Sequence, residues 1–155
     1  MKLLRRSIIV LCLFFLLTEL VYALPEGKYY DSSLKDKVKN NESTVIELNQ
    51  KGKFDGNTFT AQRIINTSDK THLRYRLISN GRGWSFAGSF TLFDENHKEY
   101  KGFSSGMHGK SWGQEGIVIF DKLPESAKKV TLVVECYDRK LELKLPLNKA
   151  GNKNE

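Results

Sequence analysis

Apolar and polar residues alternate along residues 116–147, and this alternation constrains the fold more than any other feature of the chain. A period of two is what a β-strand with one buried face requires. The apolar members are Val130, Leu132, Val134 and Cys136 in the first run, and Leu141, Leu143, Leu145 and Leu147 in the second. A shorter apolar run at residues 117–120 precedes them and ends in a proline-bearing corner. Three successive strands of this kind predict the closing part of an antiparallel sandwich.

The chain from residue 44 onward continues this pattern of short strands separated by turns. The turns are marked by glycine, asparagine and aspartate, as in Asp55-Gly56-Asn57 and at residues 80–83. We expect strands at residues 44–50, 58–67, 73–77, 84–92, 98–103, 117–120, 130–136 and 141–147. The sequence therefore predicts an all-β fold, an antiparallel β-sandwich of about seven to eight strands that is close in size to one immunoglobulin-like domain.

Residues 1–23 have the layout of a secretory signal peptide. A basic start precedes an almost wholly apolar run at residues 7–17, and compact residues end the segment at Ala23. The alternative is an uncleaved membrane anchor, but the apolar run is shorter than the roughly 20 residues that span a bilayer, and Glu19 interrupts its extension. We therefore expect cleavage between Ala23 and Leu24, with no stable membrane span afterwards.

Two polar segments flank the predicted sandwich, which covers residues 44–147. Residues 24–43 have few apolar anchors and are typical of a linker, although Leu34 and Val38 would give a short helix one apolar face. Residues 148–155 form a second polar stretch, typical of a flexible tail. The domain organisation is thus a signal, a linker, one domain and a tail.

Cysteine content shows how an exported domain of this kind is stabilised. The chain has two cysteines, and removal of the signal with Cys12 leaves Cys136 alone. No internal disulfide is then available, so the core must stabilise the domain. Cys136 shares the apolar parity of its strand and is expected to be a small buried hydrophobic residue rather than a reactive thiol.

The charge of the chain is moderately basic, with 25 Lys and Arg against 18 Asp and Glu and a net charge of +7. Basic and acidic residues are interleaved in most segments. Such an excess favours anionic surfaces, so a cell-envelope polymer or a surface protein is the expected partner. A nucleic-acid-binding protein would show a clustered basic stripe, and we therefore expect no nucleic-acid partner.

Residues 104–116 depart from the strand pattern, because they contain four glycines and no periodicity. A connection of this length is often a functional loop. Trp112 lies in its middle, and it either caps the end of the sandwich or is exposed to stack on a sugar face or a peptide. His108, Lys110 and Gln114 would then supply polar contacts at the rim, and these four residues form the candidate ligand site.

Catalytic and metal-binding patterns are weak in this chain. Gly109-Lys110-Ser111 resembles the end of a phosphate-binding loop, but the first glycine of that motif is replaced by Ser104. The three histidines lack the spacing of a zinc site, and the serines near His108 lack the glycine-flanked turn of a hydrolase nucleophile. We expect no catalytic residues, no metal and no cofactor.

Three segments carry a resemblance to a known group of proteins. They are Gly-Lys-Phe-Asp-Gly-Asn-Thr at residues 52–58, Leu-Phe-Asp at residues 92–94 and the run from Phe-Asp-Lys-Leu-Pro to Val-Thr-Leu at residues 120–132. The chain resembles uncharacterised extracellular Ig-like modules of Gram-positive, bacillus-type bacteria, which often occur beside anti-sigma-factor-like membrane proteins. The resemblance implies an Ig-like fold and a secreted or surface location, and it transfers no catalytic residues.

These features together predict a secreted or cell-surface binding module without catalytic activity. The alternatives are a small secreted hydrolase and a sensor or accessory domain of an envelope stress system. The sequence leaves the ligand and the oligomeric state open.

Overall fold

The computed structural model describes the chain except for residues 1, 24–31, 80–85, 87, 111 and 148–155. The described part contains two helices and nine strands. The helices are α1 (Lys2–Ala23) and α2 (Ser32–Lys39). The strands are β1 (Thr44–Phe54), β2 (Asn57–Asn66), β3 (Lys70–Ile78), β4 (Ser89–Phe93), β5 (Glu99–Lys101), β6 (Phe103–Lys110), β7 (Gly113–Asp121), β8 (Lys129–Cys136) and β9 (Arg139–Pro146).

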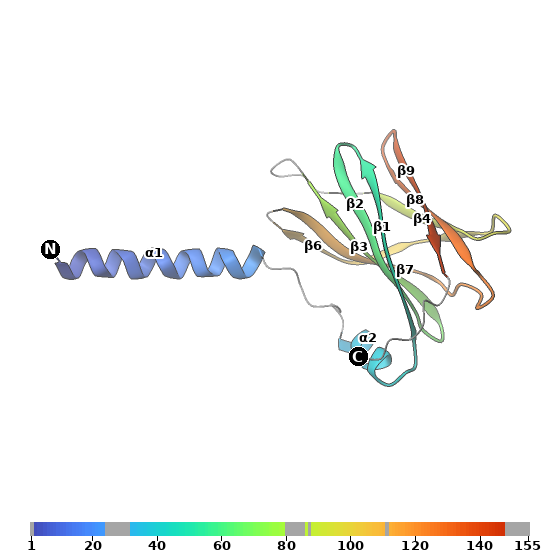
Figure 1. The fold of residues 1–155 in the computed structure, drawn as a ribbon, viewed down its shortest axis with the longest axis horizontal. Coiled ribbons are helices and arrows are strands. Elements are labelled where there is room, and N and C mark those ends of the chain that lie inside the picture. Colours follow the sequence, from blue (N-terminus) through green and yellow to red (C-terminus); the bar gives the residue numbers. More distant parts are fainter. Residues whose placement is uncertain (1, 24–31, 80–85, 87, 111, 148–155) are drawn as a thin grey trace.

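The strands form two antiparallel sheets that pack face to face (Figure 1). One sheet has the order β1-β2-β3-β7-β6 and the other β5-β4-β8-β9. Immunoglobulin domains have the order A-B-E-D in one sheet and C-F-G in the other, with C′ added beside C in variable-type domains. Strands β2 to β9 follow that order, and β1 is an additional strand outside β2. The predicted Ig-like β-sandwich is confirmed, with β6 as the strand that the sequence did not predict.

The core lies between the two sheets and follows the predicted alternation. Val130, Leu132 and Val134 of β8 are buried, and Leu145 of the neighbouring strand β9 lies beside Val130 on the same inner face. Cys136 is half-buried and packs against this core. Each alternating run therefore contributes one face to the interior, as the period of two requires.

Aromatic rings occupy the place where antibody domains carry their disulfide and tryptophan. Those groups belong to strands B, F and C, and here Tyr75 on β3 and Phe90 on β4 pack with ring centroids 4.9 Å apart. Phe59 stacks on Tyr75 at 5.5 Å and lies 6.3 Å from Phe90, and Phe86 contacts Phe90 at 5.4 Å. Burial of these rings stabilises a sandwich that has no disulfide in its described part.

Helix α2 packs on the outer face of the five-stranded sheet, which corrects the prediction of a linker over residues 24–43. Leu34 is only 3% exposed and forms a second apolar cluster with Ile65 of β2 and Ile117 of β7. Val38 packs against the same cluster from the next helical turn. The predicted short helix thus exists, and its apolar face attaches it to the sandwich. Residues 24–31 of the expected linker lie outside the described residues, as do the tail at 148–155 and Trp84.

Helix α1 covers the expected signal segment and lies away from the sandwich (Figure 1). Its apolar side chains from Ile8 to Leu17 are largely exposed. The expected cleavage position follows its last residue, Ala23, and Leu24 is outside the described residues. No helix among the described residues has both the length and the apolar composition needed to cross a membrane.

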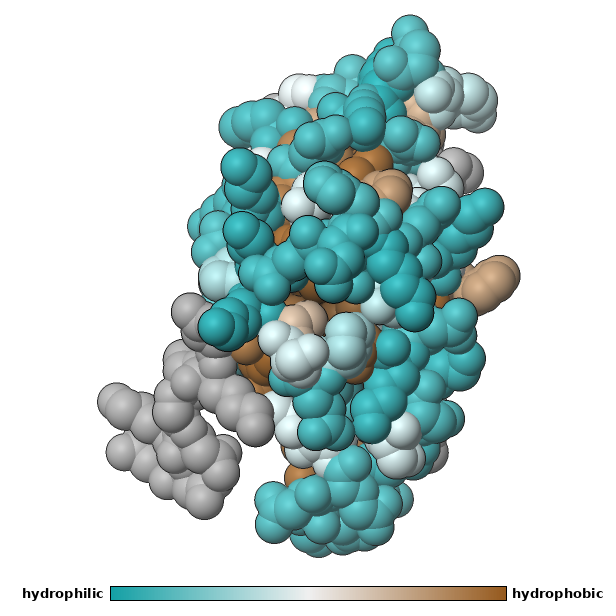
Figure 2. All heavy atoms as spheres, turned by 90° about the vertical axis from the view of Figure 1, so that its right-hand side faces the viewer, coloured by the Kyte–Doolittle hydropathy of each residue, from teal (hydrophilic) through white to brown (hydrophobic). Residues whose placement is uncertain are grey.

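The outer face of the four-stranded sheet is polar. Figure 2 shows that hydrophilic residues cover most of the side that lies to the right in Figure 1. Lys129, Lys140, Glu142 and Lys144 contribute to it from β8 and β9. Lys140 Nζ and Glu142 Oε1 form an exposed ion pair of 2.8 Å, which raises the pKa of Lys140 because the carboxylate favours its charged form.

Candidate functional site

Three tight turns lie at one end of the sandwich, which we call the apical end. They join β1 to β2, β6 to β7, and β8 to β9. The register places them together, because Ile78 pairs with both Thr58 and Gly113 at one end of the five-stranded sheet. The chain then crosses from Ile78 to Ser89, which pairs with Glu135 beside the β8–β9 turn. In antibody variable domains the loops of one such end form the binding surface.

The predicted loop at residues 104–116 is instead a β-hairpin made by β6 and β7. His108 pairs with Glu115 and Lys110 pairs with Gly113 across it. The hairpin has no visible alternation because almost all of β6 is exposed on both faces. Glycines Gly106 and Gly109 remove further side chains from the pattern. The expectation of a long irregular loop was therefore wrong, although Lys110 and Trp112 do lie at a turn.

Trp112 lies at this turn and packs on the sandwich through Arg76. The guanidinium carbon of Arg76 is 5.1 Å from the centroid of the Trp112 ring, and the ring is half-buried. The backbone N–H of Ser79 donates to the Trp112 carbonyl at 3.0 Å, which connects the turn to the end of β3. Trp112 therefore covers the edge of the sheet and keeps part of its ring accessible.

Arg76 belongs to a buried ion cluster beneath that ring. Its Nε donates to Glu115 Oε1 at 2.6 Å, and Arg74 Nη2 donates to Glu115 Oε2 at 3.3 Å. Glu115 and Arg74 are buried, whereas Arg76 is half-exposed. A buried carboxylate held by two guanidinium groups leaves one net positive charge next to Trp112. The cluster fixes the position of Arg76 without neutralising this part of the surface.

Gln114 does not lie at a rim, since it is 5% exposed and points into the core. Its Nε2 donates to the Tyr75 hydroxyl at 2.8 Å, and its Oε1 accepts from the backbone N–H of Phe86 at 3.2 Å. Burial raises the pKa of Tyr75 to about 12, because the phenolate loses its hydration there. Gln114 thus attaches residue 86 to the core and supports the apical end from inside. His108, by contrast, is exposed on β6, so only Lys110 and Trp112 of the four predicted site residues lie together at the turn.

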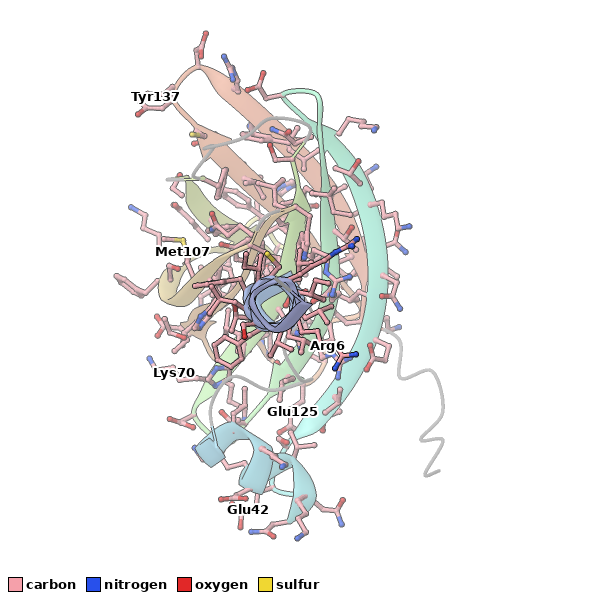
Figure 3. The ribbon with its side chains drawn as sticks, turned by 90° about the vertical axis from the view of Figure 1, so that its left-hand side faces the viewer. Arg6, Glu42, Lys70, Met107, Glu125 and Tyr137 are labelled. Carbon is pink, nitrogen blue, oxygen red and sulfur yellow. The ribbon has the colours of Figure 1, made fainter. Side chains whose placement is uncertain are left out.

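Tyr137 is the apical residue that the sequence analysis missed. It occupies the β8–β9 turn with φ of 56° and is 97% exposed (Figure 3). Arg139, at the start of β9, forms an ion pair with Asp55 in the β1–β2 turn, which joins two of the three turns. The sequence did contain a sign of this exposure, since Tyr137-Asp138 is a two-residue turn between two strands. The side chain of a residue in such a turn lies at the surface, where it cannot be buried in the core.

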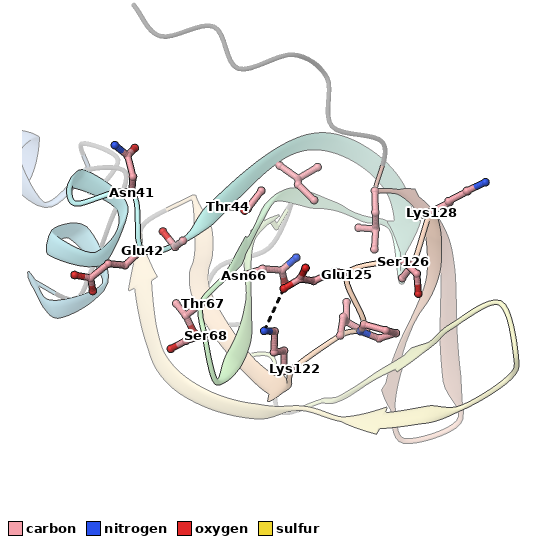
Figure 4. A pocket seen from close by; sticks show the side chains of 16 residues that line it. Asn41, Glu42, Thr44, Asn66, Thr67, Ser68, Lys122, Glu125, Ser126 and Lys128 are labelled. Atoms are coloured by element: carbon pink, nitrogen blue, oxygen red, sulfur yellow. Dashed lines mark hydrogen bonds and ion pairs between the residues drawn. The ribbon is translucent and has the colours of Figure 1, made fainter.

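A hollow of about 590 Å³ lies at the opposite end of the sandwich (Figure 4). Its lining residues come from four segments: the α2–β1 connection, the β2–β3 turn, the β7–β8 connection and the end of β9. Asn66 Oδ1 accepts from Thr71 Oγ1 at 2.8 Å, and Thr71 Oγ1 accepts from the N–H of Leu123 at 3.1 Å. Lys122 and Glu125 are paired at 3.5 Å on its wall. The hollow is polar and balanced in charge.

Titratable side chains do not gather into a metal site in the described part of the chain. No group of three or more His, Cys, Asp or Glu residues is close enough there to hold an ion. Asp94 uses its carboxylate to cap a turn, accepting from the N–H groups of Asn96 and Lys98. These bonds, that from Lys98 above all, lower the pKa of Asp94 by stabilising its charged form.

Comparison with known proteins supports the fold. No family model and no curated protein matches the chain. One similar solved structure is described as "The crystal structure of the conserved domain protein from Bacillus anthracis", with a TM-score of 0.56 and 15% sequence identity. The match covers 68% of this chain and 49% of that one, so this chain spans about half the length of the protein it resembles. At this identity the likeness concerns the fold alone.

Proposed function

We propose that this protein is a secreted or cell-surface interaction module without catalytic activity, whose partner binds at the apical end. The observation that carries the proposal is the exposed ring of Tyr137 on a tight turn that is joined to its neighbour through Arg139 and Asp55. A tyrosine side chain has only two χ angles, so it loses little conformational entropy on binding while it removes much surface from solvent.

Trp112 and Arg76 form a second part of the apical end, at the β6 edge of the five-stranded sheet, whereas the turn of Tyr137 lies beside the β1 edge. Their stacking and the ion pair to Glu115 hold the guanidinium in place before any partner arrives. Tyrosine, tryptophan and arginine are the residues that most often dominate binding energy at interfaces. An arrangement held in advance also lowers the entropic cost of association.

An anionic polymer of the cell envelope is the partner that fits the charges. Residues 1–23 carry three basic residues and one acidic residue, so the net charge of +7 becomes +5 without them. At the apical end Lys110 and the guanidinium of Arg76 are positive, whereas Arg139 is paired with Asp55. Positive groups around aromatic rings favour polyanions with exposed sugar faces. Location outside the cytoplasm rests on the basic start and apolar run of residues 1–23, and the resemblance to extracellular Ig-like modules agrees with it.

The test is binding of the purified protein to isolated cell-wall polymer at increasing salt. We expect binding that weakens steeply with ionic strength and that Tyr137→Ala reduces. His108→Ala should leave binding intact, and the protein should release no soluble fragments from the polymer, which separates this function from that of a hydrolase. If Tyr137→Ala does not reduce binding, the partner does not bind at the apical end. If the protein binds a surface protein but not the polymer, the proposed polymer partner is wrong.

A further inference from the structure

Strand β6 is the one long sheet edge that is left uncovered among the edge strands described. At the other edge of its sheet, β1 packs against β9, which is itself an edge of the second sheet. The remaining edge strand, β5, has three residues, whereas β6 has eight. Among the described residues β6 pairs with β7 alone. A β-bulge between Ser104 and Gly106 interrupts the register with β7, so the outward N–H and C=O groups on either side of Ser105 offer a short template for another strand.

The side chains of β6 also present apolar surface to solvent. Phe103 is 74% exposed and Met107 is 51% exposed, so each leaves a large apolar side chain that a partner could cover. Phe103 pairs with Ile119 on the outer face of the sheet, and Met107 pairs with Gly116 on the inner face. A Cβ added at Gly106 would meet no atom within 4 Å, so the strand is open to close approach between them.

We propose that β6 is a docking edge for an extended, acidic peptide segment of a partner protein, which adds to the five-stranded sheet as a sixth strand. Main-chain hydrogen bonds would supply affinity, and alternate side chains of the peptide would contact Phe103 on one face and Met107 on the other. This surface is distinct from the apical rings of Tyr137 and Trp112, and it takes a ligand of a different class.

The charges near the ends of β6 favour a peptide with acidic residues. Lys110 ends β6. Lys101 lies two residues before β6, at the end of β5, with a largely exposed side chain 4.0 Å from Glu99, so a lysine lies near each end of the edge. Two copies of the chain paired antiparallel through β6 would bring the Lys110 end of one copy toward the Lys101 side of the other at both ends. Like charges in such positions are destabilising. An incoming strand with acidic residues at its ends meets the opposite sign, which favours a peptide over a second copy.

The probe is the peptide Ac-Glu-Val-Thr-Val-Thr-Val-Glu-NH2, titrated into isotope-labelled full-length protein and followed by NMR. We expect amide shifts that concentrate on residues 103–110 and the paired residues of β7. The same peptide with lysine in place of both glutamates should bind about tenfold more weakly, as expected for a few exposed charge pairs. Alternate N-methylation of the first peptide should abolish binding, because it removes main-chain donors.

Two variants separate this surface from the apical end. Met107→Glu places a negative charge on β6 and should weaken binding of the acidic peptide, whereas Tyr137→Ala should leave it unchanged. Shifts confined to the apical turns, or no shifts with the acidic peptide, would overturn the proposal. Concentration-dependent dimerisation in sedimentation that Met107→Glu abolishes would assign the edge to a second copy and overturn it as well.

Discussion

Arg74 Nη2 lies 3.3 Å from Glu115 Oε2, and both side chains are buried on the outer side of the five-stranded sheet. Arg76 contacts the same carboxylate, so two guanidinium groups share the single negative charge of Glu115. A buried pair of this kind contributes little compared with an apolar pair, but breaking it leaves a charge without compensation. Loss of the Glu115 charge should therefore lower the stability more than loss of the charge of an exposed acidic residue, and unfolding measurements can detect this difference.

Glu115→Gln should lower the free energy of unfolding by about 3–5 kcal/mol, because Arg74 remains buried beside a neutral amide. Glu125→Gln is the control, since Glu125 pairs with Lys122 at 3.5 Å in an exposed position. Its loss should be below about 1 kcal/mol. Urea denaturation of both variants measures the difference, and equal losses would contradict a buried role for Glu115.

Because Tyr75 is buried, the protein should lose stability at alkaline pH. Burial raises its pKa to about 12, whereas the unfolded chain deprotonates the same group near its ordinary pKa of 10.0. The folded state therefore holds the proton more tightly, so the contribution is complete below pH 10 and is lost as the pH rises toward 12. Between these two pH values the free energy of unfolding should fall by about 1.4 kcal/mol per pH unit.

Tyr75→Phe isolates this contribution from that of the lysines. The variant loses the hydrogen bond from Gln114, which should cost about 1 kcal/mol at neutral pH. The original protein should therefore be more stable than Tyr75→Phe at neutral pH. This difference in stability should shrink and change sign between pH 10 and 12, as followed by thermal unfolding. A constant difference across that range would show that Tyr75 does not titrate as its burial implies.

Two glycines of the β6–β7 hairpin predict opposite outcomes for the same substitution. Gly113 has φ of 147°, and a Cβ there would clash with the Leu77 carbonyl oxygen. Gly113→Ala should therefore cost more than about 2 kcal/mol. At Gly109 a Cβ would meet open space, so Gly109→Ala should change stability by no more than about 0.5 kcal/mol. Comparable losses in denaturant unfolding would contradict this geometry.

Leu34 predicts that α2 is part of the folded domain. Leu34→Ala removes a side chain packed on Ile65 and Ile117, and it should lower the free energy of unfolding by about 2–3 kcal/mol. Hydrogen exchange should also become faster in α2 and in the facing stretch of β2. Lys35→Ala on the exposed side of the helix is the control and should leave exchange unchanged. No difference between them would mean that α2 does not contribute to the stability of the domain.

The sequence predicted those parts of the fold in which one face of a strand is buried. The shared parity of Val130, Leu132 and Val134 was enough to place β8 in the core. Strand β6 was missed because an edge strand exposed on both faces has no alternation. The docking of α2 was missed because Leu34 has its partners in β2 and β7, which only the pairing of distant strands brings together.

The sequence drew attention to residues of the candidate site but did not give their geometry. Trp112 and Lys110 were proposed because an aromatic residue among glycines is conspicuous, and the structure places both at the β6–β7 turn. Gln114 was misplaced at the rim, since its burial depends on which face of β7 it occupies. The ion cluster of Glu115 requires the register between β3 and β7, and the spacing within one segment does not reveal it.

Tyr137 and Trp112 give the prediction that tests the apical end directly. Tyr137→Ala removes an exposed ring and should leave the free energy of unfolding within about 0.5 kcal/mol of the original value. Trp112→Ala also removes the stacking on Arg76 and should cost about 0.5–1 kcal/mol. Each variant should weaken binding to cell-wall polymer by about fivefold to thirtyfold, the effect of losing an interface ring worth about 1–2 kcal/mol. Pull-down at two salt concentrations measures it, with Glu125→Gln at the opposite end as the control. If Glu125→Gln reduces binding and the two apical variants do not, the partner binds at the hollow of Figure 4 instead.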